Sequence, residues 1–251
     1  MSTRVVAIPA RLGSTRLERK VLTDIAGQTL LHRTHDVAVA AGVGSVVVLT
    51  DSEEVAAEVR AFGGEALLTA AELDSGTARV AAVVEVLDAD IVVNLQGDAP
   101  LTDPSVVARS AQEAGASGAA VTMAVYELEH PADLHDPSVV KVVRGHDGRV
   151  LYCSRSAIPH VRDVPTDRWT ERAHCLGHSG IYAYNRSFLQ RFPELPPSPL
   201  EDAERLEQLR WLQAGLHVHS FLVEPQGPSV DTAEQLERVR AAFALREGQP
   251  T

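Results

Sequence analysis

Basic residues near the N-terminus form the first group that could carry out chemistry. From Pro9 to Lys20 the chain reads PARLGSTRLERK, which places three arginines and a lysine among glycine, serine and threonine. Backbone amides and cationic side chains in such a loop can bind phosphate groups together, and a triphosphate suits this chemistry. A basic surface loop without a ligand is the alternative, since the segment contains neither a Walker motif nor a GxGxxG motif.

Lysine is rare in this chain, because only Lys20 and Lys141 are lysines among its 23 basic residues. A compact ammonium suits a point contact with phosphate oxygens, where a planar guanidinium fits less easily. The rarity of lysine therefore favours a specific task for both residues. A solvated lysine without a task is the alternative.

Two aspartates are candidate metal ligands. Asp98 comes directly after Gly97, just beyond the apolar segment at residues 91–95. Asp231 lies in the segment GPSVDTAE. Carboxylate oxygens are the ligands that hard cations prefer. Each aspartate could also form a turn or cap a helix.

The segment DSGTAR, residues 74–79, is a third candidate for ligand binding. The hydroxyls of Ser75 and Thr77, the local amides and the Arg79 guanidinium could contact a base or a ribose. Thr77 could instead cap the helix that follows.

Alternating strands and helices must position these residues. Apolar segments of strand length occupy residues 4–8, 45–49, 65–68 and 91–95, and helical periodicity covers residues 30–41, 52–62 and 77–87. This order predicts an α/β fold with a doubly wound, mainly parallel sheet, whose ligands bind beyond the carboxyl ends of the strands. The loops Pro9–Lys20, Thr50–Asp51 and Gln96–Pro100 are therefore expected to meet there.

From about Ala119 the pattern changes to strands without full helices between them. Strands are expected at residues 119–126, 139–144, 150–154, 177–184 and 218–223, and helices at residues 200–214 and 232–246. This pattern predicts a smaller antiparallel or mixed region. The segment Pro159–Ala173 is expected to be a mobile loop or a dimer arm.

Composition excludes several classes of protein. A net charge of −11 argues against nucleic-acid binding, which requires a basic surface. No segment approaches the length of a membrane span or reads as a signal peptide, so a cytoplasmic protein is expected. Cys153 and Cys175 lack metal-ligand spacing and are expected to be reduced, without a chemical role.

Several motifs in this order resemble the 3-deoxy-manno-octulosonate (Kdo) cytidylyltransferase family, which makes CMP-Kdo. They are IPARLGSTRL, TDSEEVA, DSGTAR, VNLQGDAP, VVKVV, LYCSRSAIP, LGHSGIYAY, PSPLEDAERLEQLRWL and VDTAEQLERV. The resemblance covers nearly the entire chain. It implies one nucleotidyltransferase domain over residues 1–251, with a nucleotide-binding half (1–118) and a sugar-acid-binding and dimerisation part (119–251). It also implies CTP and a 3-deoxy sugar acid as substrates, Mg²⁺ as cofactor, a homodimer and a place in lipopolysaccharide biosynthesis.

The resemblance also implies a role for individual residues. Arg11 and Lys20 match the family's triphosphate contacts and, with the magnesium ligands Asp98 and Asp231, its catalytic residues. The other implied nucleotide contacts are Pro9, Ala10, Ser75, Gly76, Arg79, Gln96 and Gly97. The implied sugar-acid contacts are Gln96, Arg155, His178, Tyr182, Glu207 and Gln208.

Some of these residues have a plainer explanation. His178 could be a hydrogen-bonded core histidine, and Glu207 and Gln208 could lie on a solvated helix face. Arg155 follows an expected strand, and its guanidinium matches a sugar carboxylate bidentately.

The chain departs from the family pattern in three places. The usual Arg-x-Pro-Gly-Lys-Pro reads Arg16-Leu17-Glu18-Arg19-Lys20-Val21 here, and alanine replaces glutamate at Ala78 and Ala99. These changes bear on the identity of the sugar more than on the reaction. A cytidylyltransferase for 8-amino-Kdo or a nonulosonate, and a CTP-binding homologue without catalysis, therefore remain alternatives. A dinucleotide dehydrogenase is disfavoured, because a basic loop follows the first strand in place of a glycine fingerprint.

Overall fold

The computed structural model describes residues 2–13 and 17–247, and the chain divides into two compact units. The first unit contains the residues up to Ala111 and those from Gln226 onward, and the second contains Gln112–Pro225. The C-terminal segment thus groups with the first unit, whereas the division made from the sequence placed it with residues 119–225. Within the described residues, no helix combines the length and the apolar character that a bilayer crossing requires.

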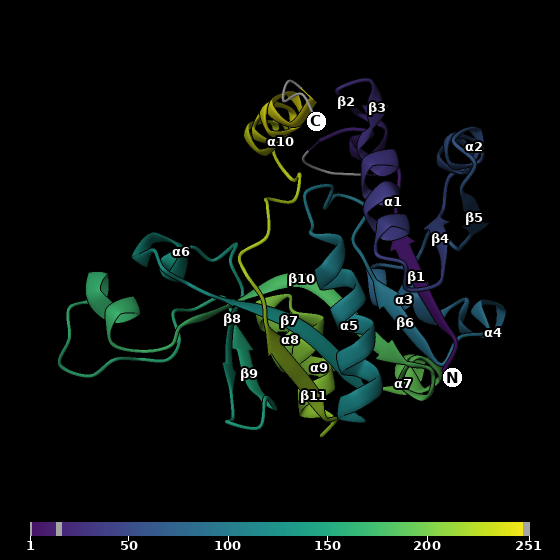
Figure 1. Ribbon diagram of the computed structural model, residues 1–251. Coiled ribbons are helices and arrows are strands. Elements are labelled where there is room, and N and C mark those ends of the chain that lie inside the picture. The colour runs from purple at the N-terminus through teal and green to yellow at the C-terminus, as the bar shows by residue number, and fades with distance from the viewer. Residues whose placement is uncertain (1, 14–16, 248–251) are drawn as a thin grey trace. The chain divides into compact units, whose positions relative to one another are not determined.

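A parallel sheet forms the centre of the first unit (Figure 1). Its strands are β1 (Arg4–Pro9), β4 (Ser45–Thr50), β5 (Glu65–Leu68) and β6 (Ile91–Asn94), in the spatial order β6-β1-β4-β5. All of β6 is buried, and so are the four central residues of β1, because a sheet covered on both faces needs apolar side chains on both. The prediction of a mainly parallel, doubly wound α/β fold is confirmed.

Four helices lie between these strands in the sequence, and a fifth follows β6. The four are α1 (Leu30–Ala40), α2 (Glu53–Ala61), α3 (Gly76–Ala81) and α4 (Val84–Leu87), and the fifth is α5 (Pro104–Ser117). The single helix predicted over residues 77–87 is wrong in one respect, because Val83 leaves helical geometry at φ −118° and ψ 11°. Four valines lie between residues 80 and 86, and β-branched side chains lose rotamer freedom in a helix, which weakens it there.

Helix α5 was not predicted from the periodicity, although its start carries a recognisable signal. Asp103 precedes Pro104, the first residue of the helix, and accepts a hydrogen bond from the Ser105 amide at 2.8 Å. An aspartate cap followed by proline is a common helix start.

The C-terminal helix α10 (Ala233–Glu247) belongs to the core of the first unit. It packs against a short hairpin that is far away in the sequence. The strands of this hairpin, β2 (Asp24–Ile25) and β3 (Gln28–Thr29), lie near the N-terminus. One buried cluster joins these elements and consists of Ile25, Leu30, Val230, Leu236, Val239 and Phe243. This packing brings the segment that contains Asp231 into the unit that contains β1.

The second unit contains a mixed sheet. Its strands are β7 (Val121–Glu127), β8 (Lys141–Arg144), β9 (Val150–Ser154), β10 (Leu176–Asn185) and β11 (Val218–Leu222). β10 runs antiparallel to β7 and β8, β8 and β9 form an antiparallel pair, and β11 runs parallel to β7. The prediction of an antiparallel or mixed region is confirmed.

The helices of the second unit are short. They are α6 (Pro131–His135), α7 (Arg186–Arg191), α8 (Pro199–Glu204) and α9 (Glu207–Gln213). The one helix predicted over residues 200–214 is two helices, because Arg205 adopts a left-handed conformation at φ 53° and ends α8.

The segment 159–173 contains a short 3-10 helix, Thr166–Glu171, where a loop or dimer arm was expected. Trp169 of this helix is buried in a cluster with Leu128, Leu134 and Cys175.

Both cysteines are buried and free, and burial raises the pKa of Cys153 to about 12. A thiol with so high a pKa is not a nucleophile at neutral pH.

Candidate active site

A cavity of about 240 Å³ lies in the first unit, beside the carboxyl ends of β1 and β6. Residues predicted to contact the nucleotide or the metal line it together. They are Pro9, Ala10, Arg11, Lys20, Ser75, Gly76, Arg79, Gln96, Gly97, Asp98 and Asp231. Four other residues also line the cavity: Gly13 and Asp74 lie within the selected motifs but were not assigned a contact, and Val21 and Leu73 directly adjoin these motifs.

The close approach of two loops explains the glycine before Asp98. The Gly97 amide donates to the Pro9 carbonyl at 3.3 Å, and a Cβ at Gly97 would lie 3.0 Å from that oxygen and 3.2 Å from the Ala10 Cβ. A larger residue would push the end of β1 away from the loop after β6. Glycine thus allows the loop that carries Asp98 to lie against the start of the phosphate loop.

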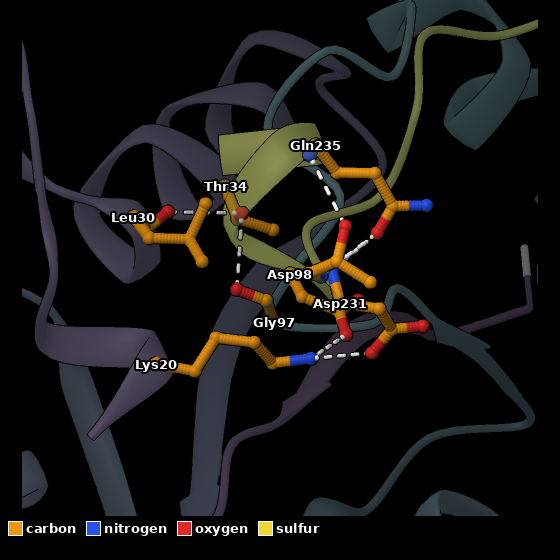
Figure 2. Close-up of polar contacts among 8 residues, drawn as sticks. Lys20, Leu30, Thr34, Gly97, Asp98, Asp231 and Gln235 are labelled. Carbon is orange, nitrogen blue, oxygen red and sulfur yellow. Dashed lines mark hydrogen bonds and ion pairs between the residues drawn. The ribbon is translucent and has the colours of Figure 1, made fainter. Parts of the chain in front are cut away.

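Lys20 joins the two candidate metal ligands (Figure 2). Its Nζ lies 2.5 Å from Asp98 Oδ2 and 3.0 Å from Asp231 Oδ1. The Val230 amide also donates to the Asp98 carbonyl at 2.9 Å. Two carboxylates that are far apart in the sequence are therefore held within reach of one positive charge.

The donor set at this point fits Mg²⁺. Among the described residues, no group of three or more His, Cys, Asp or Glu side chains could form a complete protein cage for a metal. Mg²⁺ is commonly bound by one or two carboxylates, with substrate phosphates and water completing its shell. The two aspartates beside a basic loop match this partial set of oxygen ligands.

Ser75 and Gly76 form the start of α3 at the cavity. Ser75 caps α3, since its Oγ accepts from the Ala78 amide at 3.0 Å, so the expected cap at Thr77 is replaced by Ser75. A Cβ at Gly76 would lie 3.1 Å from Gln96 Nε2 and 3.4 Å from Asn94 Nδ2. The glycine therefore allows these polar side chains to approach the start of α3.

Arg79 stabilises the cavity wall. Its side chain is 3% exposed and donates to Thr69 Oγ1, to the Ala70 and Leu73 carbonyls at 3.2 and 3.3 Å, and to Asp51 Oδ2 at 3.4 Å. Asp51 Oδ1 in turn accepts from the Leu12 amide at 3.4 Å. Arg79 thus connects the loop before α3 with the phosphate loop, and a direct contact between Arg79 and a nucleotide stays a prediction.

The phosphate loop is described on both sides of Ser14, Thr15 and Arg16, which lie outside the described residues. Arg11 is exposed at the cavity. Arg19 is in a left-handed conformation at φ 53°, and its side chain forms an ion pair with Glu54. Of the two adjacent basic residues, only Lys20 lines the cavity.

A specific task was expected for both lysines. Lys20 lines the cavity, whereas the task of Lys141 is structural. Lys141 is fully buried, and its Nζ donates to the carbonyls of Asp136 and Val139 at 2.8 and 2.6 Å. Lys141 therefore stabilises the turn before β8, and the expectation of a phosphate contact does not fit its surroundings.

The second unit brings together three of the predicted sugar-acid contacts. The rings of His178 and Tyr182, both on β10, are 4.6 Å apart, and Gln208 Nε2 donates to the Tyr182 hydroxyl. Gln208 is 5% exposed, so the alternative of a solvated helix face is wrong for this residue. Glu207 is close enough that its charge helps to raise the pKa of Tyr182, after the larger effect of burial.

Two buried polar atoms in this cluster lack a hydrogen-bond partner. His178 Nε2 and Gln208 Oε1 are both buried and make no hydrogen bond within the described residues. Buried polar atoms are nearly always satisfied by protein or water, so a water molecule or a polar ligand is expected to contact these two atoms. His178 also forms a hydrogen bond with the Ile181 backbone, as the alternative of a hydrogen-bonded core histidine requires, and its contact with a sugar acid stays a prediction.

Arg155 has a different set of contacts. Its Nε donates to the Glu204 carbonyl at 2.7 Å, and its terminal nitrogens donate to the Pro137 and Arg205 carbonyls at 2.8 and 3.4 Å. The Glu204 carboxylate accepts from Ser154 Oγ and from the Arg155 amide, at 2.9 and 2.6 Å. The sequence analysis missed Glu204, which fixes the end of β9 to the end of α8. A contact between Arg155 and a sugar carboxylate stays a prediction.

Burial of His178 predicts a pH dependence of folding. Burial lowers the pKa of His178 to about 4, from 6.5 in an unfolded chain. Between these values the unfolded state binds the proton and the folded state does not, so stability is complete above pH 6.5 and falls as the pH drops toward 4. The shift corresponds to a loss of at most about 3 kcal/mol.

We expect the unfolding free energy of the wild type to fall more steeply below pH 6.5 than that of His178→Gln. Urea denaturation at several pH values between 7.5 and 4.5 measures this difference. The variant isolates His178, because burial also lowers the pKa values of His35 and His219 in both proteins. Parallel curves for the two proteins would contradict the assigned pKa.

Comparison with known proteins identifies the family of this chain. The sequence profile of the cytidylyltransferase family matches residues 5–220. A 3-deoxy-manno-octulosonate cytidylyltransferase from Escherichia coli is 42% identical over 245 residues, covering 97% of each chain. The enzyme of the same name from Leptothrix cholodnii is 44% identical, covering 95% of this chain and 90% of the relative.

A solved structure has the same fold over almost all of this chain. It is CMP:2-keto-3-deoxy-manno-octonic acid synthetase complexed with CTP, with a TM-score of 0.91 and 41% identity, covering 98% of this chain and all of the other. Both kinds of comparison extend over nearly the full length of the chain and not over one motif. The chain therefore belongs to the 3-deoxy-manno-octulosonate cytidylyltransferase family.

Proposed function

We propose that this enzyme converts CTP and Kdo into CMP-Kdo and diphosphate. The observation that supports this most strongly is the position of Asp98 and Asp231, which share the ammonium of Lys20 in a cavity lined by the residues predicted to bind nucleotide. The family to which the chain belongs carries out this reaction, and the cavity residues match the family's motifs.

The reaction is a direct displacement at phosphorus. The anomeric 2-hydroxyl oxygen of the sugar acid attacks the α-phosphorus of CTP and loses its proton. The bond from the α-phosphorus to the bridging oxygen breaks, and diphosphate leaves with that electron pair. No covalent intermediate with the enzyme is needed.

Positive side chains in the cavity stabilise the charge that moves onto diphosphate. Lys20 and Arg11 both line the cavity, and Lys20 is partly buried, with 12% of its side chain exposed. A partly desolvated cation stabilises a developing negative charge more strongly than an exposed one. A magnesium ion bound by Asp98 and Asp231 would reduce the repulsion between the triphosphate and the sugar carboxylate.

The second unit supplies polar contacts for the sugar acid. His178 is neutral at pH 7, because burial lowers its pKa to about 4, so it contributes hydrogen bonds and not a positive charge. The unsatisfied Gln208 Oε1 and His178 Nε2 would pair with sugar hydroxyls. Arg155 remains the candidate contact for the carboxylate.

A cytidylyltransferase for a related sugar acid is the second candidate function. The observation that favours it is Ala99, which lies between Asp98 and Pro100 where the family usually has glutamate. The loss of a carboxylate beside the metal ligands could change which sugar is accepted. The magnesium requirement, the homodimer, the cytoplasmic location and the place in lipopolysaccharide biosynthesis also remain predictions.

We expect diphosphate release with CTP and Kdo, and much slower release with ATP or GTP. A pyrimidine is expected because the resemblance places the base beside Ala10, Ser75 and Gln96. A coupled diphosphate assay with each nucleotide, and with Kdo, 8-amino-Kdo and a nonulosonate, measures both preferences. Equal rates with the purine nucleotides would contradict the base assignment, and faster release with another acid would favour the second candidate function.

A further inference from the structure

Helix α10 begins with a reciprocal pair of hydrogen bonds. Thr232 Oγ1 accepts from the Gln235 amide at 3.2 Å, and Gln235 Oε1 accepts from the Thr232 amide at 3.0 Å. This pattern is a capping box, in which the residue at the helix start and the residue three positions later satisfy each other's amides.

The Gln235 side chain makes one contact that a capping box does not require. Its Oε1 also accepts from the Asp231 amide at 2.8 Å (Figure 2). Asp231 precedes the helix, so no hydrogen bond of the helix itself fixes this peptide. The contact joins the helix directly to the residue whose carboxylate contacts Lys20.

The residue before Asp231 is fixed as well. The Val230 amide donates to the Asp98 carbonyl at 2.9 Å, and the Val230 side chain is fully buried in the core cluster. Hydrogen bonds therefore hold the backbone at Val230 and at Asp231. Together they set the direction in which the Asp231 carboxylate leaves the chain relative to Asp98.

We infer that Gln235 is a positioning residue that orients Asp231 for cation binding. Its amide oxygen accepts the Asp231 and Thr232 amides, as a glutamate carboxylate also would. Glutamine adds no negative charge beside Asp98 and Asp231, whose two charges face the single ammonium of Lys20. The inference rests on the proposed function, because it assumes that these aspartates bind a divalent cation.

The test measures Mn²⁺ binding in the presence of CTP and without sugar acid, by electron paramagnetic resonance of the free ion. We expect Gln235→Ala to weaken Mn²⁺ binding about tenfold, as is typical when a residue that orients a metal ligand is lost. Gln235→Glu keeps the acceptor, and we expect its Mn²⁺ affinity to stay within about threefold of wild type.

Ser198→Ala is the matched control for loss of a helix cap. Ser198 Oγ accepts from the Glu201 amide at 3.0 Å at the start of α8, in the second unit. We expect this variant to lose thermal stability, as Gln235→Ala does, and to bind Mn²⁺ like the wild type. Equal weakening in Ser198→Ala and Gln235→Ala would overturn the inference, because general destabilisation would then explain both.

Two further results would also overturn it. One is wild-type Mn²⁺ affinity in Gln235→Ala, and the other is equal weakening in Gln235→Ala and Gln235→Glu, since the acceptor would then be irrelevant. Asp231→Asn separates this inference from the proposed function. If Asp231→Asn binds Mn²⁺ like the wild type, the cation site itself is wrong; if it binds weakly while Gln235→Ala binds normally, only the positioning role fails.

Discussion

Replacing Asp98 or Asp231 with asparagine is expected to lower turnover at least about a hundredfold, with the protein still folded. Each aspartate contributes one carboxylate to the pair beside Lys20, and asparagine keeps the shape of the side chain but removes its charge. A neutral amide is a poorer ligand for Mg²⁺ than a carboxylate. Steady-state rates of diphosphate release at saturating CTP and Mg²⁺ measure the effect, and circular dichroism checks the fold.

Asp36→Asn is the control for this pair of variants. Asp36 lies on α1 of the same unit, is 52% exposed and contacts His32 at 3.7 Å. The same chemical change there should leave turnover within about twofold of wild type, because exposed pairs contribute little. Full activity of the wild type in excess EDTA, or full activity of Asp98→Asn, would contradict a catalytic role for a cation at these carboxylates.

Lys20→Ala is expected to lower kcat and kcat/KM together. The ammonium is placed to stabilise diphosphate as it leaves, so its removal should affect the transition state more than the ground state. Loss of one such charge-assisted contact costs roughly 2–4 kcal/mol, or about thirtyfold to a thousandfold in rate. Steady-state kinetics with varied CTP separates this effect from a change in KM alone.

Arg19→Ala is the matched control, because Arg19 is the adjacent cation. Its side chain is 53% exposed and pairs with Glu54, and it does not line the cavity. We therefore expect a mild change for Arg19→Ala and a severe one for Lys20→Ala. A severe effect of Arg19→Ala with a mild effect of Lys20→Ala would assign the phosphate contact to Arg19. Near wild-type kcat/KM in both variants and in the double variant would exclude this loop as the triphosphate site.

The sequence revealed the parts of the fold that depend on local patterns. Continuous apolar runs identified the buried strands β1 and β6, and the connection rules for parallel strands placed the loops after them at one edge. The helix breaks at Val83 and Arg205 were not predicted, because apolar periodicity continues across both positions. Backbone conformation at a single residue leaves little trace in such a pattern.

The candidate site also contains features that the sequence predicted and features that it did not. Both aspartates could be selected as candidate metal ligands from the sequence, Asp98 from its place after a strand and Asp231 from the segment GPSVDTAE, and the family resemblance implied that they act together. Their proximity depends on the Val230 contact with the Asp98 carbonyl, which joins distant parts of the chain. The contacts of Arg79 and Arg155 could not be foreseen, because most of their partners are backbone carbonyls, which any residue type provides.

The most direct test of the central claim is phosphorus NMR of a reaction that contains the enzyme, CTP, Mg²⁺ and Kdo. The proposed function predicts that the three CTP signals are replaced by equal amounts of diphosphate and a new CMP phosphodiester. The same mixture without Kdo should keep its CTP. Unchanged CTP in the presence of Kdo and each related acid, from a protein that still binds CTP, would contradict a cytidylyltransferase and would favour a CTP-binding homologue without catalysis.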